Sequence, residues 1–338
     1  MALNLLLLGI LIKFFVFTDA QSVGVCYGEF GNPLPSQQEV VNLYRANGIT
    51  RMRIYAPNRA TLNALRGTNI ELILDVPNID LESLNDRNKA ITWVTDNVLN
   101  YRDVKFRYIS VGNEVDPNNP DTRRFVGFVL PAMRNVQNAL IAAGLNQIKV
   151  STATYTGLLA KSYKPSEGVF HDNVVSFIGP IITFLGQNGS PMLANIYPYF
   201  AHVGPPKLSD LSFALFTRTT PAYDDQGRQY SNLFDAMYDA HYAAQSRLGG
   251  SDIEIVVSES GWPSFGEDVA TVENAGTYYK NLISHVKGRT GTPARPGRSI
   301  ETYLFAMFDE NQKPNKETER HFGVFNPVTR QKKYQLSF

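Results

Sequence analysis

The sequence is poor in cysteine, with only Cys26 among 338 residues. A single thiol cannot form an intramolecular disulfide, so the folded chain must rely on its core and not on cross-links. Cys26 lies in the apolar run Val23-Gly24-Val25-Cys26-Tyr27. We therefore expect it to be buried packing material and not a nucleophile.

An excess of charge of either sign is also missing. Lys and Arg number 32 and Asp and Glu number 31, which gives a formal net charge of +1. This balance gives no reason to expect a nucleic acid or an anionic membrane as a partner. It is compatible with a neutral carbohydrate.

The motifs of several enzyme classes are absent from the sequence. The five histidines show no HExxH spacing and have no companion cysteines, so no metal site is expected. There is no GxGxxG after a strand-like run, no Walker pattern and no GxSxG elbow. We expect no cofactor.

Only one long apolar run is present, from Leu3 to Phe17, and it is too short to span a bilayer comfortably. Small residues follow it at Thr18-Asp19-Ala20, where a signal peptidase could cleave. Two features are atypical of a signal peptide: Lys13 interrupts the apolar run, and no Lys or Arg precedes the run. The alternative is a signal anchor that is not removed. We expect residues 1–20 to be a signal peptide and residues 21–338 to be one folded domain.

Strand-like apolar runs recur along the rest of the chain, with amphipathic segments between them. This alternation is typical of a parallel sheet covered by helices. Eight β/α repeats in one chain of this length predict a single closed (β/α)8 TIM barrel, an α/β fold, and not two open sheets. The eight runs are Ser22–Gly28, Arg51–Pro57, Glu71–Pro77, Lys105–Glu114, Gln147–Tyr155, Pro191–Phe200, Asp252–Gly261 and Ile300–Glu310.

Helices are expected between these runs. Ser36-Gln37-Gln38-Glu39 has the capping-box pattern and opens a helix that continues to Ala46. The other predicted helices are Asp86–Asn100, Asp121–Ala143, Leu233–Leu248 and Glu273–Lys287. Loops rich in Gly, Pro and Asn are expected after the strands, on the active face of such a barrel. They are Gly31–Pro33, Asp116–Pro120, Gly204–Pro206 and Thr292–Gly297.

Two of the strand-like runs end in a glutamate. Glu114 closes Tyr108-Ile109-Ser110-Val111-Gly112-Asn113-Glu114, and Glu259 closes Glu254-Ile255-Val256-Val257-Ser258-Glu259. Both are therefore expected at the active face. Polymeric sugars are cleaved by two carboxyl groups that flank the scissile bond. The sequence thus predicts a carbohydrate-cleaving pair.

The neighbours of each glutamate fit the same chemistry. Asn113 could bind the sugar 2-hydroxyl, whose contact strengthens in the transition state. Trp262 follows Glu259 by three residues, and an indole face can stack on a pyranose ring. For Asn113 and Glu114 the alternative is a strand end before the polar turn Asp116–Asn119.

Two further groups of residues are candidates for supporting roles. After the eighth run, Glu310, Lys313 and Glu319 could tune the catalytic pair, hold sugar hydroxyls or be solvated loop charges. Tyr55, and Tyr197 in the segment that begins at Asn195, lie near strand ends. Either tyrosine could hydrogen-bond the nucleophile or a sugar, or could close a core layer.

With these residues in view, the chain resembles the plant β-1,3-glucanases of glycoside hydrolase family 17. The resemblance extends from Gln21 to Phe338. The run Ser258-Glu259-Ser260-Gly261-Trp262-Pro263 is similar to the signature of that family. Other matching segments are Gly24–Gly28, Met52–Tyr55, Leu130–Asn135, Asn195–Tyr199 and Phe305–Lys313.

The resemblance implies a barrel with an open substrate groove that hydrolyses internal β-1,3 bonds with retention. It implies that Glu259 is the nucleophile and Glu114 the acid/base, with Glu310, Lys313 and Glu319 as an accessory charged cluster. Tyr55 and Tyr197 match groove tyrosines, whereas Ala56 departs from the larger or polar residue often found there.

The expected substrates are β-1,3-glucans such as callose, laminarin-type polymers and fungal wall glucan, in plant defence or wall remodelling. We expect a monomer exported to the cell wall, since a C-terminal extension found in some relatives is missing. Two alternatives remain: a 1,3-1,4-β-glucanase on the same scaffold, and a carbohydrate-binding protein that has lost catalysis. The presence of both Glu114 and Glu259 argues against the second.

Overall fold

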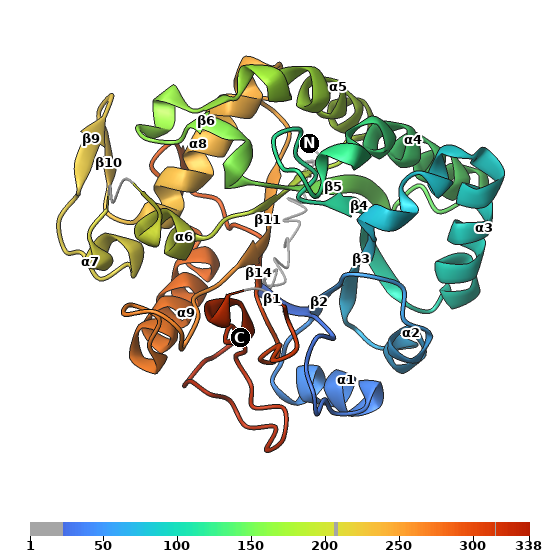
Figure 1. Ribbon diagram of the computed structural model, residues 1–338, viewed down its shortest axis with the longest axis horizontal. Helices are drawn as coiled ribbons and strands as arrows, with labels where there is room; N and C mark the ends of the chain where they lie inside the picture. The colour runs from blue at the N-terminus through green and yellow to red at the C-terminus, as the bar shows by residue number, and fades with distance from the viewer. Residues whose placement is uncertain (1–22, 206–208, 315) are drawn as a thin grey trace, which may run out of the picture.

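Parallel strands form a closed barrel at the centre of the molecule (Figure 1). The structure is a computed structural model and describes residues 23–205, 209–314 and 316–338, so the predicted signal peptide lies outside the described residues. Around the barrel the order is β1-β14-β11-β8-β5-β4-β3-β2, and β1 pairs with both β14 and β2, which closes the ring. The predicted (β/α)8 barrel is therefore confirmed.

Each of the eight predicted runs contains one barrel strand. The strands are β1 (Val23–Tyr27), β2 (Arg51–Ile54), β3 (Glu71–Val76), β4 (Lys105–Asn113), β5 (Lys149–Tyr155), β8 (Met192–Asn195), β11 (Ile255–Ser260) and β14 (Thr302–Leu304). The sixth run is shorter than predicted, because Pro198 opens the helix α6 (Pro198–Val203), where its fixed φ fits the first turn. The eighth run is also shorter, since β14 ends at Leu304.

Helices surround the barrel (Figure 1). The predicted helices correspond to α1 (Gln37–Ala46), α3 (Arg87–Asn97), α4 (Val126–Ala142), α8 (Leu233–Arg247) and α9 (Val272–Lys287). The capping box at Ser36 and Glu39 is confirmed. Helix α4 begins later than predicted, because Arg123–Phe125 form a 3-10 turn before it.

Three other helices were not predicted: α2 (Arg59–Leu65), α5 (Asp172–Asn188) and α7 (Leu211–Ala214). Gly179, Pro180 and many β-branched residues give α5 a low helix propensity. Its buried side chains nevertheless recur at helical spacing, among them Val174, Phe177, Ile178, Ile181 and Leu185. Burial of this apolar face outweighs the low propensity.

Short two-stranded hairpins decorate the loops: β6 (Leu159–Lys161) with β7 (Val169–Phe170), β9 (Tyr223–Asp225) with β10 (Arg228–Tyr230), and β12 (Gly291–Thr292) with β13 (Arg295–Pro296). The last hairpin corrects one prediction. Because it lies between α9 and β14, the Thr292–Gly297 loop precedes a strand and belongs to the face opposite the active face. Across the described ranges, no helix is long and apolar enough to cross a membrane.

Candidate active site

Glu114 follows the last residue of β4 in a strained backbone conformation. Its φ is +52°, in the left-handed region that non-glycine residues seldom adopt. Gly112 precedes it with φ +83°, and a Cβ there would lie 3.2 Å from the Oδ1 of Asn78. The side chain of Asn78 makes two hydrogen bonds to the backbone of Asn113, donating to its carbonyl and accepting from its N–H, each at 2.8 Å. This turn directs the Glu114 carboxyl toward the cavity.

Glu259 lies in β11 where the register of this strand shifts, between Val257 and Ser260 against β14 and between Val257 and Glu259 against β8. Its carboxylate accepts three hydrogen bonds. Tyr55 and Arg53 both donate to Oε1 at 2.8 Å, and Tyr197 donates to Oε2 at 2.7 Å. Burial raises the pKa of both tyrosines well above the ordinary value, so both phenols keep the proton that they donate. Of the alternatives that the sequence left open for these tyrosines, the structure shows the contact with the nucleophile candidate.

Arg53 lies at the centre of the site and was not singled out from the sequence. Its side chain is fully buried, and it reaches Glu259, Asn195, Asn113 and Asp75. Burial alone would lower its pKa, but the adjacent carboxylates outweigh this, and the guanidinium stays charged. A charged residue inside the apolar run Met52-Arg53-Ile54 was the available signal, since a buried cation requires partners.

The side chain of Asn195 contacts Glu114 directly and is joined to Glu259 through Arg53. Its Nδ2 donates to the Oε1 of Glu114 at 2.8 Å and to the Oδ1 of Asn113 at 3.1 Å. Its Oδ1 accepts from Ser258 at 2.8 Å and from Arg53 at 3.2 Å. The amide orientation is therefore fixed on both sides, and the predicted Asn195 and Asn113 both lie in the site.

The two glutamates differ in their electrostatic surroundings. Burial, and then the nearby Glu259, raise the pKa of Glu114 to about 7 from its ordinary 4.5, while the hydrogen bond from Asn195 and the charge of Arg53 oppose this. Glu114 thus keeps a proton well above the pH at which an exposed glutamate loses it. It has the properties of a general acid.

The charged residues after β14 form a separate cluster. Lys313 lies 2.9 Å from Glu310 and 3.8 Å from Glu319, and its ammonium sits over the ring of Phe305 at 4.3 Å. Gly28 lies against this cluster, and a Cβ there would lie 2.0 Å from the Oε1 of Glu310, so a larger residue would displace that carboxylate. Lys313 therefore pairs with the cluster carboxylates, and the cation that contacts Glu259 is Arg53.

Trp262 lies elsewhere than predicted. Its indole is fully buried, with ring centroids 5.1 Å from Tyr199 and 5.5 Å from Tyr278, and its Nε1 donates to the carbonyl of Val269. After Gly261 the chain turns inward against the end of β14, where a Cβ would meet the Phe305 carbonyl at 2.4 Å. The indole therefore has no face open to a sugar. Phe200, which is 40% exposed and lines both cavities described below, is an aromatic residue open to a ligand.

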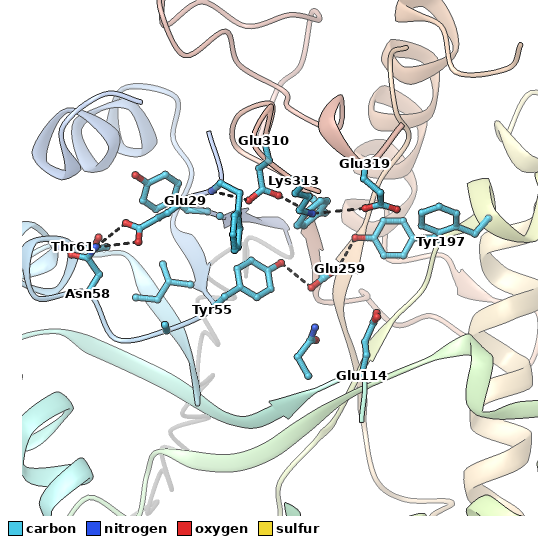
Figure 2. Close-up of a pocket in the computed structure, with 18 residues that line it drawn as sticks. Glu29, Tyr55, Asn58, Thr61, Glu114, Tyr197, Glu259, Glu310, Lys313 and Glu319 are labelled. Carbon is cyan, nitrogen blue, oxygen red and sulfur yellow. Dashed lines mark hydrogen bonds and ion pairs between the residues drawn. The ribbon is translucent and has the colours of Figure 1, made fainter. Parts of the chain in front are cut away.

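Two cavities meet at Glu114. The first, of about 400 Å³, contains both glutamates and extends to Glu29 and Asn58, as Figure 2 shows. In that view Glu114 lies on one side of Glu259, and Glu310, Lys313 and Glu319 lie on the other. The second cavity, of about 590 Å³, is largely lined by apolar and aromatic side chains. The two cavities share Glu114, Tyr197 and Phe200 as lining residues. Together they form one depression that extends to both sides of Glu114.

All predicted site residues except Asn195 and Trp262 line the first cavity, and Asn195 lines the second. Cys26 is fully buried, as predicted, and its thiol donates to the Ser258 carbonyl at 3.3 Å. Burial raises the pKa of this thiol far above its ordinary value, so it cannot act as a thiolate nucleophile.

A family model described as glycosyl hydrolases family 17 matches residues 23–338. The chain belongs to this family. Relatives of similar length support the assignment to family 17. A glucan endo-1,3-beta-glucosidase of Vitis vinifera is 60% identical over 336 residues, covering 98% of this chain and 96% of the relative. The acidic isoform GI9 of glucan endo-1,3-beta-glucosidase from Nicotiana tabacum is 56% identical over 342 residues, covering 100% and 97%.

Solved structures share the same fold over nearly the whole chain. CJP38, a β-1,3-glucanase and allergen of Cryptomeria japonica pollen, has a TM-score of 0.91 at 47% identity, covering 94% of this chain and 98% of that one. A structure from work on two plant β-glucan endohydrolases with distinct substrate specificities has a TM-score of 0.88 at 43% identity, covering 93% and 100%.

Proposed function

We propose that this family 17 protein is a retaining endo-β-1,3-glucanase that acts on wall glucans such as callose and fungal β-1,3-glucan. The observation that carries the proposal is the contrast between two carboxyl groups at one cavity. Glu114 holds its proton up to about pH 7, and Glu259 accepts from three donors. The names of the most similar relatives support the β-1,3 linkage.

In the first step Glu259 attacks C1 of the sugar, the C1–O bond breaks, and Glu114 gives its proton to the leaving oxygen. In the second step the ionised Glu114 takes a proton from water, whose oxygen attacks C1 and releases Glu259. The Oδ1 of Asn113 is occupied by Arg53 and Asn195, and the described residues leave its Nδ2 for the sugar 2-hydroxyl.

The linkage is tested by comparing initial rates on laminarin and on barley mixed-linkage glucan. We expect reducing ends from laminarin, with oligosaccharides of several lengths early in the reaction, as internal cleavage requires. Preference for barley glucan would indicate the 1,3-1,4 alternative, and no hydrolysis of either would indicate a binding protein. Retention predicts that the β-anomer is released first in ¹H NMR, and an α-anomer would contradict it.

The roles of the two glutamates are tested with variants that leave different residual reactions. Glu259→Gly should abolish hydrolysis but couple α-laminaribiosyl fluoride to laminari-oligosaccharides, because the vacated space accepts a donor that mimics the covalent intermediate. Glu114→Ala should still react with substrates carrying good leaving groups, and azide should speed turnover and give a β-glycosyl azide. Glu29→Gly, at the far end of the cavity, should show neither behaviour. Glycosynthase activity from Glu114→Ala would reverse the assignment.

We further propose that the protein is exported to the cell wall as a monomer after removal of residues 1–20. The apolar run Leu3–Phe17 and the small residues before Gln21 support cleavage. Mass spectrometry of the protein from plant culture medium should give an N-terminus at Gln21, and light scattering should give a monomer mass. A protein that keeps Met1 and stays with membranes would contradict export.

A further inference from the structure

Asp75 is a buried carboxylate that the catalytic scheme does not use. It lies in β3, is 1% exposed and lines neither cavity. Both of its oxygens accept from Arg53, Oδ1 from Nε at 3.2 Å and Oδ2 from Nη2 at 2.7 Å. Desolvating a carboxylate is unfavourable, so its position inside the barrel requires a physical reason.

The reason lies in the geometry of the guanidinium. A two-pronged contact with Asp75 fixes the plane of Arg53, because the five N–H groups of arginine form a rigid fork. With that plane fixed, Nη1 reaches Glu259 at 2.8 Å and the Ser258 carbonyl at 3.1 Å, while Nη2 also reaches Asn113 at 2.9 Å. Without Asp75 the fork could rotate, and these contacts would be lost together.

We propose that Asp75 is a positioning residue for the reaction. It aims Arg53 at Glu259 and Asn113, and its negative charge balances the guanidinium beside Glu114. This inference rests on the roles proposed above for Glu114 and Glu259.

The charges around Asp75 give the proposal a specific consequence. Two charged groups face Asp75, namely Arg53 from β2 and Glu259 from β11. Cys26 of β1, which is neutral, lies nearby, and Ser110 of β4 is the strand partner of Asp75. Burial raises the pKa of Asp75, and its pairing with Arg53 opposes this. Arg53 also lowers the pKa of Glu114 against the effect of burial. Without the negative charge of Asp75, the positive charge of Arg53 should favour the ionised form of Glu114 more strongly. The pKa of Glu114 should then be lower than in the wild type.

The test is a ¹³C NMR titration of labelled glutamate side chains, with Glu114 assigned by its loss in Glu114→Gln. In Asp75→Asn we expect Glu114 to titrate at lower pH than in the wild type, by about half a pH unit or more. We also expect kcat on laminarin to fall at least about tenfold, with a smaller change in KM and an alkaline limb at lower pH. The titration needs no substrate. If the wild type were inactive on laminarin, the proposed function would be refuted, and the titration would still test the effect of Asp75 on Glu114.

Asp239→Asn is the matched control. Asp239 is an equally buried aspartate in α8, 3% exposed, that accepts from Tyr230 and from the Ala294 amide, and it lines neither cavity. Its substitution should lower Tm but leave the titration of Glu114 and the pH profile unchanged. An unshifted Glu114 in Asp75→Asn, or a shift equal to that in Asp239→Asn, would overturn the proposal.

Asp75→Glu keeps the charge and displaces the carboxylate, and it decides the proposal if Asp75→Asn does not fold. We expect Glu114 to titrate as in the wild type, because the balancing charge remains. We expect kcat to fall because the fork of Arg53 is displaced. Wild-type kcat in this variant would overturn the positioning role, and a lowered Glu114 titration would overturn the charge-balancing role.

Discussion

Glu114 owes its high pKa more to burial than to its partner. Desolvation is the largest cause, the charge of Glu259 comes second, and Asn195 acts in the opposite direction. Two carboxylates can be read from a sequence, whereas the depth of their burial, which is the larger cause here, cannot. For the same reason Arg53 was not singled out from the sequence as the cation beside Glu259, whereas Lys313 pairs with Glu310.

Glu114→Gln should be more stable than the wild type at neutral pH. A folded pKa of about 7 above an ordinary 4.5 means that the wild type is fully stabilised below about pH 4.5 and loses stability as the pH rises through 7. The difference corresponds to at most roughly 3 kcal/mol. In urea unfolding, the difference in free energy of unfolding between Glu114→Gln and the wild type should grow from pH 4.5 to pH 7. It should stay constant above pH 7.

Activity should decline over the same range, since Glu114 must be protonated to act as an acid. The alkaline limb of kcat/KM on laminarin should therefore fall near pH 7. A stability difference that does not depend on pH, or activity that persists to about pH 9, would contradict this environment for Glu114.

At the scale of elements, the end of β4 depends on the loop after β3. Asn78 makes two hydrogen bonds to the backbone of Asn113, and the backbone N–H of Glu114 donates to the carbonyl of Ala153 in β5 at 2.8 Å. A residue held at φ +52° persists only where its surroundings fix it. The loop after β3 therefore acts on the acid without touching its carboxyl.

Asn78→Ala should reduce kcat about tenfold with a smaller change in KM, because Glu114 loses the support of its backbone conformation. The unpaired amide and carbonyl of Asn113 should also cost about 1–3 kcal/mol of stability. Asn135→Ala is the control, since the side chain of Asn135 in α4 also makes two hydrogen bonds to a loop backbone, donating to the carbonyls of Leu84 and Asn85. It should lower Tm with kcat unchanged, and an equal loss of kcat in both variants would refute the role of Asn78.

For the whole molecule, local sequence patterns predicted the barrel and the placement of two glutamates at one face of it, but not the contacts between distant elements. The eight strand-like runs are local features, and Glu114 and Glu259 each lie near the end of one of them, directly after β4 and at the second-last residue of β11. Trp262 was misplaced because its burial depends on Tyr199 and Tyr278, which come from α6 and α9. Asp75 escaped attention for a similar reason, since only the closed barrel brings β2 and β3 opposite β11.

The C-terminal segment supplies another such contact, at the loop that carries the charged cluster. Phe325 bridges to Phe308, and the ammonium of Lys333 lies 2.9 Å from both carboxylate oxygens of Asp309 and 3.0 Å from the hydroxyl of Ser264. The side chains of Lys333 and Asp309 are 18% and 25% exposed, so their pair is largely shielded from water. It joins the end of the chain to the residue before Glu310.

Lys333→Met should therefore cost about 1–3 kcal/mol, between the values for exposed and buried ion pairs, because it leaves Asp309 shielded without its cation. A few-fold loss of kcat/KM on laminarin should accompany it, since the loop carrying Glu310 loses its anchor. Arg66→Met breaks the exposed pair with Asp103 and should cost only about 0–1 kcal/mol. Urea unfolding of both variants, of Asp309→Asn and of the double variant Asp309→Asn/Lys333→Met measures the coupling between Lys333 and Asp309. Equal losses in Lys333→Met and Arg66→Met, or a double variant as unstable as the sum of its singles, would show that the pair does not anchor the loop.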